Sequence, residues 1–199
     1  MLRYFAVLCL CLLSLNSFTQ GAQDAETNSN LWPVHRDQTV GFRISYPPNW
    51  VIVPARGPNV RFSVNPPDGP GNCNVVARPS VELRGMTQEQ LDREVEALPN
   101  DQEGWSGYVG IPAAQIVVIE SRRARIIQRP ALLGVLELSL ENLEGKFTRK
   151  AMVALTLSPG TIWTLNCGAT SFKPDEARSR FAAQQSTFSK VFGTFIFLQ

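Results

Sequence analysis

Apolar and polar residues alternate along much of the first half of the chain. Apolar side chains take every second position over 40–46 and 60–64, and shorter apolar stretches cover 50–53 and 73–77. A period of two residues is typical of strands that are buried on one face. Turn-forming residues separate these stretches, most clearly over 66–72, where the sequence is PPDGPGN. We therefore expect four short strands before any helix.

Two later segments have the period of a helix. The first follows Thr87, which forms a capping box with Gln90, so the sequence predicts a helix over 88–98. The second opens at Pro174, because proline is tolerated in the first turn of a helix and two carboxylates follow it. It ends near Gly193, which suits the position after a helix C-cap.

Four longer alternating segments lie between these two helices. The expected strands are 115–128, 133–142, 147–157 and 161–168. The turns between them are short, which favours antiparallel pairing because parallel neighbours need crossovers of a dozen or more residues. A closing strand is expected over 194–198. The sequence thus predicts an α+β fold in which helices pack on an antiparallel β-sheet.

The N-terminus has the pattern of an exported protein. Residues 1–21 carry one arginine, then an apolar stretch of about a dozen residues and a small-residue cleavage site, which together predict a signal peptide. Residues 22–38 are polar and unpatterned, and we expect a flexible leader there. The remaining 39–199 form a single domain with no further membrane-spanning stretch, so we expect a periplasmic or secreted protein.

The composition argues against several classes of function. The chain has 19 Lys and Arg against 17 Asp and Glu, a formal net charge of +2. This charge is too small for a surface that neutralises many phosphates, so we expect no nucleic-acid partner. The single histidine, His35, lies in the leader and is expected to be exposed, which leaves no Ser-His-Asp arrangement inside the domain and too few ligands for a usual zinc site. We expect no enzyme, no catalytic or metal-binding residues and no cofactor.

The two ends of the domain resemble the PsbP-like family. The segment 41–50, GFRISYPPNW, is similar to the family's opening, a glycine-aromatic strand that runs into a proline turn followed by tryptophan. At the far end, a strand over 163–167, a helix with Phe181 and Phe188, and a strand over 193–197 look similar as well. The family includes the extrinsic protein of photosystem II, exported bacterial proteins and a Ran-binding nuclear-import factor. The resemblance implies an exported bacterial-type member with an α/β/α sandwich and no catalysis.

Cys73 and Cys167 are the only cysteines outside the signal peptide. Each shares a strand face with apolar residues, so both are expected to point into the core. In an oxidising compartment they form a disulfide on one interpretation, and on the other they are two buried free thiols. Their separation of 94 residues excludes a C-x-x-C redox site.

Two sets of residues are candidates for contact with a partner. The first is a basic docking patch for an acidic protein or an anionic head group, with a solvated strand face as the alternative. Its members are Arg122, Arg123, Arg125, Arg129, Lys146, Arg149 and Lys150. The second set is Trp105 and Tyr108, in an expected Gly-rich loop over 104–110, which either anchor a partner or fold back on the core.

These features favour a non-enzymatic exported accessory protein that docks onto another protein or an envelope component. The alternative is a carrier that binds a lipid or an apolar small molecule between the sheet and a helix, with the phenylalanines of the last helix as its lining. Neither the partner nor the oligomeric state follows from the sequence.

Overall fold

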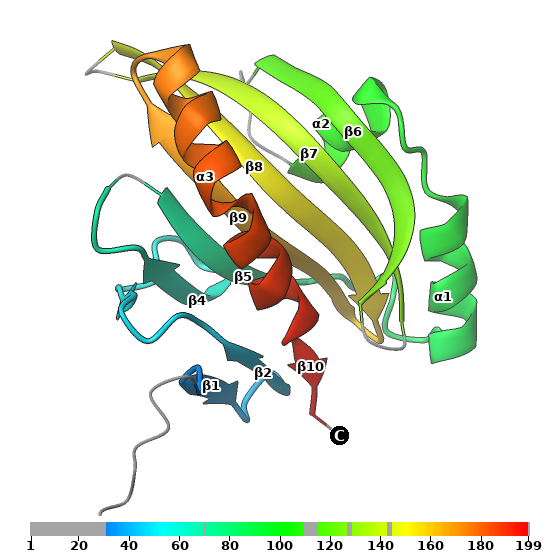
Figure 1. The fold of residues 1–199 in the computed structure, drawn as a ribbon. Helices are drawn as coiled ribbons and strands as arrows, with labels where there is room; N and C mark the ends of the chain where they lie inside the picture. Colours follow the sequence, from blue (N-terminus) through cyan, green and yellow to red (C-terminus); the bar gives the residue numbers. More distant parts are fainter. Residues whose placement is uncertain (1–30, 70, 110–114, 127–128, 143–144, 199) are drawn as a thin grey trace, which may run out of the picture. The chain divides into compact units, whose positions relative to one another are not determined.

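The structure is a computed structural model that describes residues 31–69, 71–109, 115–126, 129–142 and 145–198. Within these ranges the chain forms ten strands and three helices, shown in Figure 1. The strands are β1 (Val34–Asp37), β2 (Phe42–Ser45), β3 (Val51–Ile52), β4 (Val60–Asn65), β5 (Gly71–Pro79), β6 (Gln115–Ile126), β7 (Arg129–Asn142), β8 (Gly145–Ser158), β9 (Thr161–Ser171) and β10 (Ile196–Phe197). The helices are α1 (Gln88–Ala97), α2 (Gln102–Val109) and α3 (Pro174–Gly193).

The strands form two antiparallel sheets. The larger has the order β3-β4-β5-β9-β8-β7-β6, and the smaller has the order β1-β2-β10. The predicted meander is present as β6 to β9, each strand paired with the next along the chain. The closing strand pairs with β2 instead of joining the meander. The expected α+β fold is confirmed, with the strands divided between two sheets.

Helices cover both faces of the larger sheet. Successive residues of β7 show this, because side chains alternate between the two faces of a strand. Leu133 and Val135 lie in the cluster that includes Phe181 and Phe188 of α3. Leu132 lies in a second cluster with Trp105 of α2, and α1 packs over β7 and β8 on that same face. In Figure 1, α3 accordingly crosses in front of the sheet while α2 lies behind it.

Helix α1 begins as the sequence predicts. Thr87 Oγ1 accepts a hydrogen bond from the backbone nitrogen of Gln90 (3.3 Å), and the Gln90 side chain accepts one from the Thr87 backbone nitrogen (2.8 Å). This capping box satisfies two backbone donors that have no partner inside the helix. The buried Leu91 and Val95 then attach the helix to the sheet.

Two segments differ from the expectation. The leader was expected to lack structure through residue 38, but β1 (Val34–Asp37) pairs with β2 along its whole length. The Gly-rich loop expected over 104–110 falls largely within α2, whose first turn is capped by Asp101: its Oδ1 accepts from the backbone nitrogen of Gly104 (2.9 Å). The expected signal peptide and leader residues 22–30 lie outside the described residues.

Candidate functional site

The arginine-rich segment of β6 is divided between the two faces of the sheet. Arg122 pairs with Leu133 of β7, on the face that α3 covers, whereas Arg123 pairs with Leu132, on the face of α1 and α2. Arg125 lines a depression with Arg123, and it also lines a second one with Arg122 beside α3. The predicted patch is therefore divided between the two faces, with Arg125 at the boundary.

Arg123 holds the end of α1. Its Nη1 donates to the carbonyl oxygen of Val95 (2.8 Å) and its Nη2 to that of Leu98 (2.7 Å). The last turn of α1 has no basic residue of its own, so this guanidinium supplies the positive charge that stabilises a helix C-terminus. Arg123 is thus part of the packing between α1 and β6.

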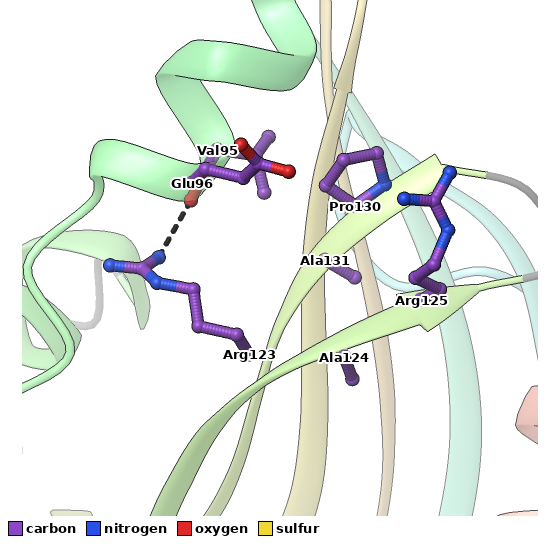
Figure 2. Close-up of a pocket in the computed structure, with 7 residues that line it drawn as sticks. All are labelled: Val95, Glu96, Arg123, Ala124, Arg125, Pro130 and Ala131. Carbon is purple, nitrogen blue, oxygen red and sulfur yellow. Dashed lines mark hydrogen bonds between the residues drawn. The ribbon is translucent and has the colours of Figure 1, made fainter.

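A depression of about 480 Å³ lies between the end of α1 and the β6–β7 hairpin. Figure 2 shows Arg123 directed toward the carbonyl of Val95, with Arg125 beside Pro130 at the other end of the depression. Glu96 contributes the one carboxylate among the residues that line it. The depression combines arginines with an apolar floor, but Arg123 is already bound to the helix.

Local partners are present for Arg122, Arg129 and Lys150 of the predicted patch. The guanidinium of Arg129 lies 4.0 Å from the ring centre of Phe197, and burial lowers its pKa. Lys150 lies 5.4 Å from the ring centre of Phe181, and Lys146 is opposite Glu141 on β7. Arg122 pairs with Glu120 at 3.2 Å.

Arg149 makes only neutral contacts among the described residues. Its Nη1 donates to Thr170 Oγ1 (3.2 Å) and its Nη2 to Asn166 Oδ1 (2.8 Å), both on β9. Burial lowers the pKa of Arg149 to about 10, because no carboxylate in that part of the chain offsets the cost of removing the charge from water. Its guanidinium therefore fixes the orientation of the Asn166 amide on β9.

Trp105 is not an exposed anchor. Its side chain is fully buried in α2, and its Nε1 donates to Ser121 Oγ of β6 (2.8 Å). Tyr108 lies on the next turn, where its hydroxyl donates to the carbonyl oxygen of Pro99 (3.0 Å). Burial, together with the nearby Asp101 carboxylate, raises the pKa of Tyr108. Trp105 therefore agrees with the alternative interpretation, in which these aromatic side chains fold back on the core.

Two of the three phenylalanines of α3 do not line an open chamber. Phe181 and Phe188 are fully buried, and their ring centres lie 5.7 Å apart. Phe188 also packs edge-on against Trp50 at 6.1 Å. Phe192 instead lines a depression of about 290 Å³ between α3 and strands β6 to β8, so only Phe181 and Phe188 are excluded as lining residues of the space that the carrier alternative assigned to a ligand.

His35 is half-buried on β1 and not in an exposed leader. Its imidazole stacks on the ring of Phe62 with the centres 4.5 Å apart. Burial lowers its pKa, and the nearby Asp37 carboxylate opposes this effect only in part. Among the described residues, His, Cys, Asp and Glu nowhere gather in a group of three or more suited to a metal ion.

Cys73 and Cys167 form a disulfide, as one of the two interpretations of the sequence predicted. They are direct register partners on the neighbouring strands β5 and β9. Both side chains are buried, so the bridge lies inside the core that α3 covers.

The sequence did not reveal that β6 is an edge strand. It is the outermost strand of the larger sheet, and its outer edge has no strand partner among the described residues. Val117 and Ile119 are about half exposed there, at 51% and 54%.

No helix in the described ranges combines the length and apolar character needed to span a membrane.

Comparisons with known proteins identify the fold. No family model matches the chain, and no curated protein matches it in sequence. The solution structure of cyanobacterial PsbP (CyanoP) from Synechocystis sp. PCC 6803 is similar over 83% of this chain and 91% of that chain, with 15% identity and a TM-score of 0.51. The chain therefore has a PsbP-like α+β fold, and an identity this low shows the fold alone.

Two further solved structures are similar to a lesser degree. A point mutant of the protein Mog1 shares 12% identity over 85% of this chain and 97% of that chain, with a TM-score of 0.48. LpqN of Mycobacterium tuberculosis, whose structure is described as involved in cell envelope biogenesis, shares 12% identity over 86% of this chain and 94% of that chain, with a TM-score of 0.43.

Proposed function

We propose that this protein is a non-enzymatic exported docking protein, and that the edge of β6 pairs with an extended, acidic segment of a partner protein. The observation that carries the proposal is the strand itself. It is 12 residues long and ends the larger sheet with an unpaired edge among the described residues. An edge of this kind presents backbone donors and acceptors that suit β-strand addition.

The side chains of β6 favour a partner over self-association. Val117 and Ile119 expose apolar surface that an added strand would cover. Beyond them the strand carries Arg122 and Arg125, while Arg123 is held by the end of α1 and Glu120 supplies the single carboxylate of the strand. Parallel pairing of two such edges would bring their arginines together, whereas an acidic strand is attracted to them, so charge favours an acidic partner.

The exported location rests on two features of the chain. The N-terminal segment 1–21 has the pattern of a signal peptide, and the Cys73–Cys167 disulfide suits an oxidising compartment. The absence of catalysis is supported by the composition, since the one histidine, His35, packs between aromatic rings.

Site-specific crosslinking tests the docking surface. A photoreactive benzoylphenylalanine is placed at Val117 or Ile119, and as a control at Val81, which is 73% exposed and lies outside β6. In extract from the native host, we expect one partner to crosslink from the two β6 positions and not from Val81. The crosslinked peptide should come from an extended segment rich in Asp and Glu.

Charge reversal gives the matched control. R122E/R125E should abolish the crosslink, whereas R93E on the exposed side of α1 should retain it. Equal labelling from Val81, or a crosslink that survives R122E/R125E, would contradict docking at this edge.

A further inference from the structure

A groove lies on the face of the larger sheet that α1 and α2 cover only in part. Its floor is formed by β5, β9 and β8, and α2 forms one wall. The cavity measures about 360 Å³, which falls in the range of small-molecule sites. A second cavity of about 380 Å³ adjoins it and shares Arg56, Val60 and Asn74.

One end of the groove is apolar. Trp105, Tyr108 and Val109 line it from α2, and Val153 and Leu155 line it from β8. Trp105 is fixed by its hydrogen bond to Ser121, so this end is preformed. Tyr108 and Val109 are partly exposed there, above the buried Trp105, Val153 and Leu155, so this end offers an apolar surface to a ligand of similar character.

The other end presents two amide groups on neighbouring strands. Asn74 of β5 and Asn166 of β9 are direct register partners, and both line the groove. Arg149 has only donors, so the Asn166 atom that it contacts must be the carbonyl oxygen, which leaves the amide nitrogen to face other partners. Asn74 Oδ1 accepts from Asn72 Nδ2 (3.5 Å), an amide–amide contact that either orientation of the Asn74 side chain can make. The N–H donor of Asn166 is thus held in place by Arg149, and the Asn74 amide lies beside it on the neighbouring strand.

The charges around the groove favour an anion. Arg56 and Arg78 line it, and none of the described residues that line either cavity is Asp or Glu. Arg149 contacts Asn166 from behind and adds a third positive charge. No carboxylate among the described residues neutralises this charge. A cation is disfavoured here, and a wholly apolar ligand would leave the amide donors unsatisfied.

The adjoining cavity has the opposite preference. Asn65 and Asn72 each bury a side-chain oxygen that has no hydrogen-bond partner among the described residues. These acceptors require donors, which an oxyanion lacks, so the anionic group of a ligand belongs at Asn74 and Asn166.

We propose that this groove binds a small organic anion. Its carboxylate, sulfonate or phosphate oxygens accept from the amide nitrogens of Asn74 and Asn166, and its apolar part packs against α2 and β8. Arg149 acts as a positioning residue, because it fixes which way the Asn166 amide points. The groove is separate from the β6 edge, so this proposal does not depend on the docking proposal.

Two fluorescent probes that differ in one anionic group test the proposal. The anion is 1-anilinonaphthalene-8-sulfonate, and its neutral counterpart is N-phenyl-1-naphthylamine. The intact protein should bind the sulfonate saturably and more tightly than the neutral probe, since a hydrogen bond to a charged group is worth about a tenfold difference or more in affinity. R122E/R125E should leave this preference unchanged.

Substitutions of similar shape assign the preference to the two amides. N74L and N166L should each weaken sulfonate binding roughly tenfold while leaving the neutral probe unchanged. N166D keeps a partner for Arg149 and so should preserve the fold, but its added charge should weaken sulfonate binding at least as much. Q184M, which removes a carboxamide from α3, is the control.

Three results would overturn the proposal. They are equal affinity for both probes, an equal loss of both probes in N74L, and sulfonate binding that N166D leaves unchanged. Near-ultraviolet circular dichroism on each variant excludes binding to a partly unfolded state. Sedimentation with phosphatidylglycerol vesicles and, for comparison, phosphatidylcholine vesicles then identifies the source of the anion. If the ligand is a lipid head group, the protein should sediment with phosphatidylglycerol vesicles, and N74L should weaken this binding. If the ligand is a free anion, the protein should bind neither kind of vesicle.

Discussion

The indole ring of Trp105 occupies the space that a side chain on Gly134 would need. A Cβ atom at Gly134 would lie 2.6 Å from Trp105 Cζ2, which is closer than carbon atoms approach without displacement. Gly134 is the register partner of Ser121, which accepts the indole hydrogen bond. The neighbouring strands β6 and β7 thus provide both the gap and the polar partner that α2 needs in order to dock.

We expect G134A to destabilise the protein by about 2 kcal/mol, because the indole must leave its position and its hydrogen bond. Urea unfolding followed by tryptophan fluorescence measures the change. The matched control is G107A in α2, where an added Cβ meets nothing within 4 Å. That substitution should be neutral or stabilising by up to about 1 kcal/mol, since alanine favours a helix over glycine. Equal effects from the two would contradict the packing described.

The elements that the sequence predicted well are those with a local signal. Alternation found the long strands, and the capping box at Thr87 found the start of α1. The shared apolar setting of Cys73 and Cys167 made a disulfide one of two options, but only the pairing of β5 with β9 brings the two sulfurs together. Strand pairing is a property of the whole fold and not of either segment.

The features that were missed depend on partners far along the chain. Helix α2 is rich in glycine, and its apolar stripe is limited to Trp105, Tyr108 and Val109. Asp101 as its N-cap is a further local signal that the sequence does contain. The burial of Trp105 follows from Gly134, which lies 29 positions later. The division of Arg122 from Arg123 follows from alternation alone, so the sequence contained the signal against one continuous basic patch.

Reduction of the Cys73–Cys167 bridge should lower the free energy of unfolding. The bridge closes a long loop in the unfolded chain, which in the chain-entropy model contributes up to about 4 to 5 kcal/mol. Urea unfolding with and without dithiothreitol measures the difference. The double variant C73A/C167A should be less stable than the oxidised protein and should not respond to the reductant. A midpoint that is the same in both conditions for the wild type would contradict a stabilising bridge.

The ion pair between Glu137 of β7 and Arg178 of α3 should make stability depend on acid pH. Arg178 donates to both carboxylate oxygens, and this hydrogen bonding lowers the pKa of Glu137. A carboxyl whose pKa is lowered by folding adds stability above its unfolded pKa, and this stability is lost as the pH falls through the folded value. E137Q should therefore cost on the order of 1 kcal/mol at pH 7 and progressively less as the pH falls through the folded pKa of Glu137.

Asp175 provides the control for this ion pair. It contacts the same Arg178, but its side chain is 95% exposed, against 14% for Glu137. D175N should cost only a few tenths of a kcal/mol at pH 7, since solvent screens an exposed pair. Chemical denaturation at pH 7, 5 and 3 compares the two variants, and a cost for E137Q that does not decrease between pH 7 and pH 3 would contradict the assignment.

Protonation of His35 should destabilise the fold near neutral pH. Burial against Phe62 and Phe42 lowers the pKa of His35 below its usual 6.5, so the folded protein binds this proton less readily than the unfolded chain does. Stability is then lost as the pH falls from about 6.5 through the lower folded value, and it levels off below that. The loss between pH 7.5 and pH 5 should be smaller in H35F, which retains a ring at this position without the titrating group. Because His35 is the only histidine of the chain, its imidazole proton signal in an NMR titration reports the folded pKa directly. A value at or above 6.5 would show that the imidazole is solvated and that β1 does not hold it against the aromatic core.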